Sequence, residues 1–170
     1  MIKLISEKIT RIIKNKKNLE KDLNVKIKNR GKEIYLSGEP EDEYIAEKII
    51  EALEFGFPFS TAMLIKKEDF DFMAINIKSC ANQKNLERVR GRIIGKNGKT
   101  LKTLSNLSNC SFEIKNNQIG IIGDPDCIKN AEEACKLLLK GSKHANVYSY
   151  LEKHHPEPIF DLGLKEPKKR

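Results

Sequence analysis

The stretch that decides the fold reads Arg90-Gly91-Arg92-Ile93-Ile94-Gly95-Lys96-Asn97-Gly98-Lys99-Thr100. Gly95 and Gly98 bracket two polar residues, an aliphatic pair precedes them, and cations surround the whole. Glycine carries no side chain, so the backbone at these two positions can approach another molecule closely. Because the bare backbone is flanked by cations, the stretch indicates a site for something negatively charged.

Apolar residues recur at helical spacing on both sides of this loop: Leu86, Val89 and Ile93 before it, and Leu101, Leu104 and Leu107 after it. A strand is predicted over 71–78, and alternating residues predict two more, near 111–114 and 118–122. A proline after Gly123 suits the first turn of a further helix. The predicted order is therefore strand, helix, glycine loop, helix, strand, strand, helix.

An internal repeat relates the two halves of the chain. Residues 19–56 can be laid over 104–141 without gaps, and apolar and turn residues then match at a constant spacing. The matches are Leu19 with Leu104, Val25 with Cys110, Ile27 with Phe112, Ile34 with Ile119, Leu36 with Ile121, Gly38 with Gly123, Pro40 with Pro125, Ala46 with Ala131, Leu53 with Leu138 and Gly56 with Gly141. Two related strand–strand–helix units therefore fill most of the chain.

The order of elements around the G-x-x-G loop resembles a type I K-homology (KH) module, which clamps a short run of nucleotides. The predicted fold class is α+β, with two tandem KH-like modules, each a three-stranded antiparallel sheet packed by helices. We divide the chain into a first module without the loop (1–58), an apolar connector (59–69), a second module with the loop (70–153) and a flexible basic tail (154–170).

Charge is concentrated in segments. The whole chain carries a formal charge of +8. Residues 1–32 hold 11 cations and 3 anions, residues 33–60 hold 1 cation and 8 anions, and residues 84–102 hold 7 cations and 1 anion. Such clustering is typical of a nucleic-acid footprint. In the first module Lys14, Lys16, Lys17 and Lys21 fit either RNA backbone contacts or a solvated charged face.

Catalytic and metal-binding patterns are missing from the sequence. Cys80, Cys110, Cys127 and Cys135 form no C-x-x-C pair, which favours buried hydrophobic roles over a disulfide framework or a zinc site. A nucleotide-hydrolysing P-loop ending at Gly98-Lys99-Thr100 would need glycine at position 93, which is Ile93. The three histidines have no acidic or cysteine partners. We expect no enzyme, no cofactor and no metal.

Targeting signals are also missing. The first 17 residues are interrupted by lysines, unlike a signal peptide. No run approaches the roughly 20 apolar residues of a membrane span. We therefore expect a cytoplasmic protein without a membrane partner.

Beyond the generic KH pattern, the chain resembles the archaeal and eukaryotic "partner of Nob" family of small-subunit maturation proteins. The resemblance covers residues 1 to about 153 and is most specific in the glycine loop. It includes the segment 121–125, the connector from Gly56 to Leu64, and the residues Gly141, His144, Val147, Tyr148, Leu151 and Glu152.

The resemblance implies a protein that binds the 3′ end of small-subunit rRNA as a single strand and assists its maturation. It implies two protein partners, a Nob-type endonuclease and the alpha subunit of initiation factor two. The RNA site that it implies consists of Arg88, Arg90, Arg92, Ile93, Ile94, Gly95, Lys96, Asn97, Gly98, Lys99 and Thr100. Two alternatives stay open: a general mRNA or translation adaptor, and a protein-interaction scaffold that uses the acidic helix from Glu39 to Glu54 and the apolar connector.

Overall fold

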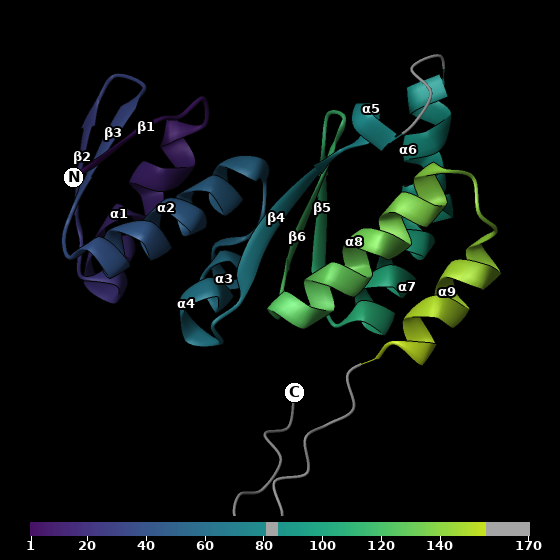
Figure 1. Ribbon diagram of the computed structural model, residues 1–170. Coiled ribbons are helices and arrows are strands. Elements are labelled where there is room, and N and C mark those ends of the chain that lie inside the picture. Colours follow the sequence, from purple (N-terminus) through teal and green to yellow (C-terminus); the bar gives the residue numbers. More distant parts are fainter. Residues whose placement is uncertain (81–84, 156–170) are drawn as a thin grey trace, which may run out of the picture.

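The computed structural model describes residues 1–80 and 85–155, which form two three-stranded antiparallel sheets flanked by helices (Figure 1). This architecture confirms the predicted α+β class. Of the predicted basic tail, residues 156–170 lie outside the described residues, as does Lys84 of the cationic cluster.

The first sheet has the strand order β1-β3-β2. Its elements are β1 (Ile2–Ile5), α1 (Ile9–Leu23), β2 (Lys26–Arg30), β3 (Glu33–Ser37) and α2 (Pro40–Phe55). Because side chains alternate along a strand, Ile27, Ile34 and Leu36 face the helices and are buried. A single helix, α1, connects β1 to β2, and it ends at Asn24, whose backbone is left-handed.

The second sheet repeats this arrangement in the order β4-β6-β5. Its elements are β4 (Asp71–Asn76), α5 (Ile77–Cys80), α6 (Leu86–Ile94), the 3-10 turn η2 (Lys96–Gly98), α7 (Lys99–Ser108), β5 (Ser111–Lys115), β6 (Gln118–Gly123), α8 (Pro125–Leu139) and α9 (His144–Lys153). The strand predicted over 71–78 was too long. The side chain of Asn76 accepts the backbone N–H of Lys78 at 2.9 Å, which turns the chain into α5.

The buried side chains of the second module lie between its sheet and α6, α7, α8 and α9, and they include three of the four cysteines. Burial raises the pKa of the Cys110 and Cys135 thiols to about 12 in each case. These thiols are therefore protonated at neutral pH and pack as small apolar groups. The repeat pairs Cys110 with Val25, which has the same role in the first core.

The connector packs against both modules. It forms two short helices, α3 (Phe59–Ala62) and α4 (Leu64–Lys67). Just before it, the rings of Phe55 and Phe57 meet Phe72 of β4 with centroids 5.8 and 6.0 Å away. Ile122 of β6 belongs to the same buried cluster as the first module's core. Part of one face of the second sheet, around Gly120 and Ile122, is thus buried against the connector and the end of α2.

Candidate nucleic-acid interface

The glycine loop joins α6 to α7 through a backbone that only glycine adopts easily. Gly95 ends α6 with φ 73° and ψ 176°, and its N–H donates to the carbonyl of Gly91 at 2.8 Å. A Cβ placed on Gly95 would collide with the Thr100 side chain and lie 2.8 Å from its backbone nitrogen. This glycine is therefore required both by its conformation and by the lack of space.

The backbone at Asn97 and Gly98 then turns the chain into α7. Asn97 and Gly98 both have left-handed conformations, with φ 54° and 72°. Asn and Gly are the residues that adopt this region at least cost. The side chains of Lys96 and Asn97 are consequently exposed at the apex of the loop.

Helix α7 begins at the loop with its first backbone N–H groups unpaired by any side-chain cap, and its first turn contains no acidic residue. The first four N–H groups of a helix have no partner within it, and the helix dipole places partial positive charge there. Lys96 and Lys99 are exposed beside this end. The combination of donor N–H groups, helix dipole and lysines suits a phosphate group.

The structure divides the predicted site residues by exposure. Arg88, Lys96, Asn97 and Lys99 are exposed, whereas Arg90, Arg92, Ile94, Gly95 and Gly98 are half-buried. Ile93 and Thr100 are buried, and the predicted ligand contacts of their side chains have to be corrected. Ile93 is fully buried in the second core, and Thr100 fills the space beside Gly95. Ile93 and Thr100 therefore pack beneath the loop and do not face a ligand.

Two of the arginines hold the loop region in place. The guanidinium of Arg90 donates to the carbonyl of Asn116, in the β5–β6 turn, at 3.1 Å. The guanidinium of Arg92 donates to the carbonyl of Ser142, and the Arg92 carbonyl lies 2.9 Å from Nε2 of His144. Arg92 therefore ties α6 to the segment between α8 and α9, which explains the His144 position noted in the sequence.

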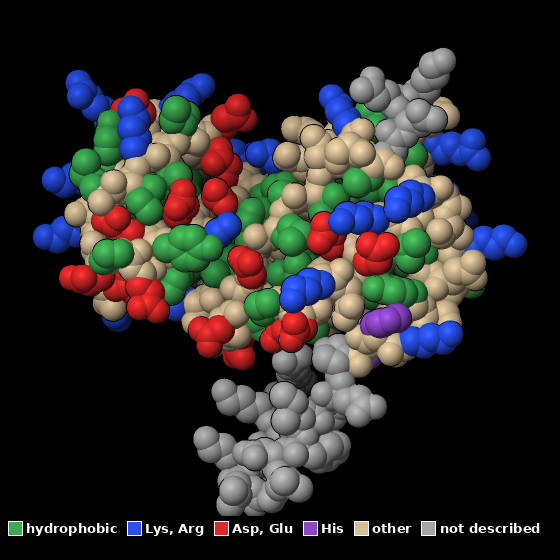
Figure 2. Space-filling model, viewed as in Figure 1, with side chains coloured by type: hydrophobic (Ala, Val, Ile, Leu, Met, Phe, Trp, Pro, Cys, Tyr) green, Lys and Arg blue, Asp and Glu red, His purple; other side chains and the backbone are tan. Residues whose placement is uncertain are grey.

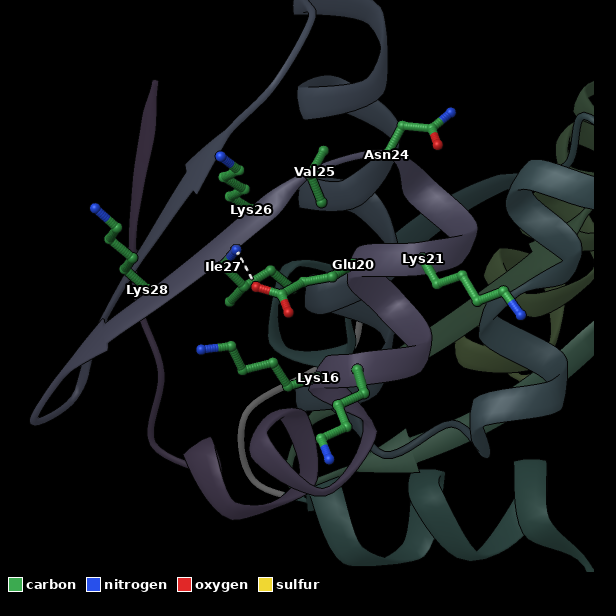
Figure 3. A pocket seen from close by; sticks show the side chains of 9 residues that line it. Lys16, Glu20, Lys21, Asn24, Val25, Lys26, Ile27 and Lys28 are labelled. Carbon is green, nitrogen blue, oxygen red and sulfur yellow. Dashed lines mark hydrogen bonds between the residues drawn. The ribbon is translucent and has the colours of Figure 1, made fainter.

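A second basic site lies in the first module, between α1 and the edge strand β2 (Figure 3). It is an open hollow of about 830 Å³ lined by Lys16, Lys17, Glu20, Lys21, Asn24, Val25, Lys26, Ile27 and Lys28. The repeat places it where the second module has α7 and β5. The carboxylate of Glu20 accepts the backbone N–H of Ile27 at 2.8 Å and so occupies one donor of the edge strand.

Sequence reasoning named three lining residues of this hollow, Lys16, Lys17 and Lys21, but missed Lys26 and Lys28. In Figure 3 the latter two project from β2, on the side away from α1. The repeat could have found them, because it aligns β2 with β5, the strand beside the glycine-loop helices. Within residues 1–80 and 85–155, no cluster of metal-ligating side chains occurs.

A family model described as the eukaryotic type KH domain (KH domain type I), for the second KH domain of PNO1 proteins, matches residues 71–156. This region is about half of the chain and contains the glycine loop. The chain belongs to the PNO1 family of KH proteins. The family resemblance seen in the sequence is thereby confirmed, and the loop between α6 and α7 lies within the region that matches the second KH domain.

Relatives and a solved structure agree with this assignment. A KH domain-containing protein of Methanocaldococcus jannaschii is 30% identical over 145 residues, 81% of this chain and 64% of that protein. The pre-rRNA-processing protein pno1 of Aspergillus fumigatus is 29% identical over 143 residues, 80% of this chain and 57% of that protein. The chain therefore spans less than two thirds of the length of these curated relatives.

The solved structure is described as a complex of a/eIF2alpha, aDim2p and rRNA from Pyrococcus horikoshii. It matches this chain with a TM-score of 0.81 and 30% identity, covering 89% of this chain and 92% of that one. Among the described residues of the present chain, none of the helices is long and apolar enough to cross a membrane.

Proposed function

We propose that this protein binds the 3′ end region of small-subunit rRNA as a single strand and assists its maturation without catalysing a reaction. The observation that carries the proposal is the glycine loop, where the first turn of α7 has no side-chain cap and lies beside exposed Lys96, Asn97 and Lys99. Backbone N–H groups beside lysines suit consecutive phosphates. Arg90 of α6 also donates to the Asn116 carbonyl in the β5–β6 turn, which holds this turn beside α6. The pre-rRNA-processing names of relatives and the rRNA in the neighbouring complex support rRNA as the RNA.

We extend the proposal to two protein partners. The related aDim2p was solved together with a/eIF2alpha as well as rRNA, which supports the alpha subunit of initiation factor two as a partner here. A Nob-type endonuclease is the second proposed partner, on the family resemblance alone. The lysine-lined hollow of the first module would bind further RNA backbone.

The loop is tested by replacing its two apical side chains. We expect the double variant Lys96→Asp with Asn97→Asp to weaken binding to the 3′-terminal sequence of archaeal small-subunit rRNA on the order of 100-fold, because it reverses charge beside the phosphates. Its unfolding free energy should change by less than about 1 kcal/mol, since both residues are exposed. The matched control, Lys129→Asp with Asn130→Asp on α8, makes the same charge change away from the loop.

Equal RNA affinity in the two double variants would refute the loop assignment. Salt dependence gives a second check, because three or four phosphate contacts to a single strand predict a log–log slope of roughly −2 to −3. A flat response would favour the scaffold alternative. Crosslinking in cell extract separates rRNA from mRNA: enrichment at the small-subunit rRNA 3′ end supports the proposal, and enrichment on many mRNAs supports the adaptor.

A further inference from the structure

The first sheet has one face covered by helices and one face that is open. We call the residues of the second face the open face; they are Lys3, Ile5, Lys26, Lys28, Arg30, Glu33, Tyr35 and Ser37. Figure 1 shows α1 and α2 on one side of this sheet, which lies at the left edge of the molecule. In Figure 2, Lys and Arg side chains project along the same edge. The strand register therefore builds a cationic surface there.

The corresponding face of the second sheet is largely covered. The residue in the place of Tyr35 is Gly120, and a Cβ on Gly120 would lie 2.7 Å from the ring of Phe55 and 2.8 Å from that of Phe57. Ile122, which takes the place of exposed Ser37, is 1% exposed. The face that forms the contact between modules in one copy thus faces solvent in the other.

Tyr35 lies at the centre of the open face in a fixed orientation. The register places Lys3 and Lys28 directly opposite it on the two neighbouring strands. Its hydroxyl donates to the carboxylate of Glu33, and Lys3 pairs with Glu33 at 2.7 Å. Nζ of Lys3 lies 5.8 Å from the ring centroid. Glu33 therefore holds the hydroxyl of Tyr35, and Lys3 lies near the ring.

The remaining open-face side chains combine charge with apolar surface. Lys26, Lys28 and Arg30 are exposed, while Glu33 is the one anion among the eight residues. Ile5 is 70% exposed, which is unusual for isoleucine. An aromatic ring beside lysines and exposed aliphatic surface is the combination by which proteins bind single strands without reading their sequence, stacking bases and attracting phosphates.

We propose that the open face is an additional binding surface for single-stranded RNA, on which one base stacks on Tyr35 while Lys26, Lys28 and Arg30 contact the neighbouring phosphates. This surface is distinct from the glycine loop and does not depend on it. It is continuous with the hollow of the first module, because Lys26 and Lys28 of the edge strand line both. A strand leaving the hollow can therefore pass around β2 onto the open face.

The experiment measures affinity of the full chain for a labelled single-stranded RNA of mixed sequence, roughly 20 nucleotides long to span more than one site. Tyr35→Thr removes the ring but keeps a β-branched residue suited to a strand. We expect it to weaken binding about tenfold, the typical effect of losing one base–aromatic stack. Tyr35→Phe keeps the ring and should stay within about twofold. Circular dichroism confirms that both variants are folded.

Two further arms separate this surface from the proposed function. Tyr35→Thr is repeated in the chain carrying Lys96→Asp and Asn97→Asp, where the remaining affinity should fall by a similar factor. An RNA containing 4-thiouridine should crosslink to the peptide that contains Tyr35. Unchanged affinity of folded Tyr35→Thr in both backgrounds would overturn the proposal and leave an acidic protein segment as the better partner. If the loop variant binds RNA as tightly as the native chain, the proposed function fails, but the effect of Tyr35→Thr can still be interpreted.

Discussion

The two modules share one three-stranded sheet arrangement, but one face of the sheet is open in the first module and partly covered in the second. Residues that face the helices are alike in both copies, as in the pairs Ile34 with Ile119 and Leu36 with Ile121, all of them buried. Residues on the other face have diverged: Tyr35 is half-exposed, whereas its counterpart Gly120 is buried under two phenylalanine rings. The comparison shows that packing against the helices constrains a repeat, while the opposite face is free to become an interface in one copy and a charged surface in the other.

The copies also differ between their first and second strands. The second module has two helices joined by the glycine loop, and the first has the continuous helix α1 (Ile9–Leu23). The first module therefore offers lysine side chains where the second offers bare backbone and a helix N-terminus without a side-chain cap. On the proposed function, the second module holds the phosphates closely and the first attracts them at longer range.

The largest expected effect comes from giving the second sheet the tyrosine of the first. Gly120→Tyr places a ring where even a Cβ would lie 2.7 Å from Phe55. Overpacking of a buried contact costs about 3 kcal/mol, so we expect a loss of unfolding free energy of this size in urea denaturation. Gly120→Ala should cost about 2 kcal/mol. The reciprocal change, Tyr35→Gly, should cost only about 1 kcal/mol, and equal losses at both sites would contradict the comparison.

A somewhat smaller effect separates the two glycines of the loop. In Gly95→Ala, the new Cβ would clash with the Thr100 side chain, and alanine would have to adopt a backbone conformation that favours glycine. We therefore expect this variant to be destabilised by about 2 kcal/mol. Gly98→Ala has open space and a left-handed conformation, so about 1 kcal/mol is expected. Urea denaturation of the two variants measures the difference. A larger loss for Gly98→Ala would show that the loop has another conformation.

Much of this structure could be predicted because its signals are local. The loop, its two helices, the hairpin and the helix after Gly123 follow from spacing and turn chemistry, and the repeat predicts the first module from the second. Other features depend on contacts distant in sequence. Ile93 is buried by the assembled core of the second module, and the pairing of Arg92 with Ser142 joins positions far apart in the chain. Helix α9 is missing from the predicted order, although its buried residues Val147 and Leu151 lie at helical spacing.

The open face illustrates the same limit. Alternation along the strands shows that Tyr35 and Lys28 point away from the helices, but not whether another element covers them. In the second sheet, Phe55 at the end of α2 and Phe57 just before the connector supply that cover. A sequence pattern predicts which residues point away from the core. Only the packing of the whole chain determines which of them are exposed to solvent.

The two modules also differ at Lys115, where one hydrogen bond joins the second sheet to the first module. Lys115 donates from Nζ to the carbonyl of Glu54 at 3.3 Å, linking β5 to the end of α2. The repeat pairs Lys115 with Arg30, which is exposed on the open face. We expect Lys115→Met to lower the unfolding free energy by about 1 kcal/mol, and Arg30→Met by less than about 0.5 kcal/mol. A loss for Arg30→Met as large as that for Lys115→Met, measured in urea, would mean that the first sheet is covered as well.

The smallest effect concerns the ionisation of Tyr35. The hydrogen bond to Glu33 raises the pKa of Tyr35, while Lys3 and then Tyr35 lower the pKa of Glu33. Since the folded pKa of Tyr35 exceeds its unfolded value of about 10, this bond stabilises the fold fully below that value, and the contribution is lost as the pH rises through the folded pKa.

The residue that the repeat pairs with Glu33 is Gln118, so Glu33→Gln gives the first sheet the side chain of the second. The amide is uncharged, and the pKa of Tyr35 should therefore fall towards its ordinary value. NMR titration of chain labelled on the tyrosine rings, with Tyr35→Phe to assign the signal, measures the shift. A Tyr35 titration that is the same in Glu33→Gln as in the native chain would show that Glu33 does not hold the hydroxyl of Tyr35.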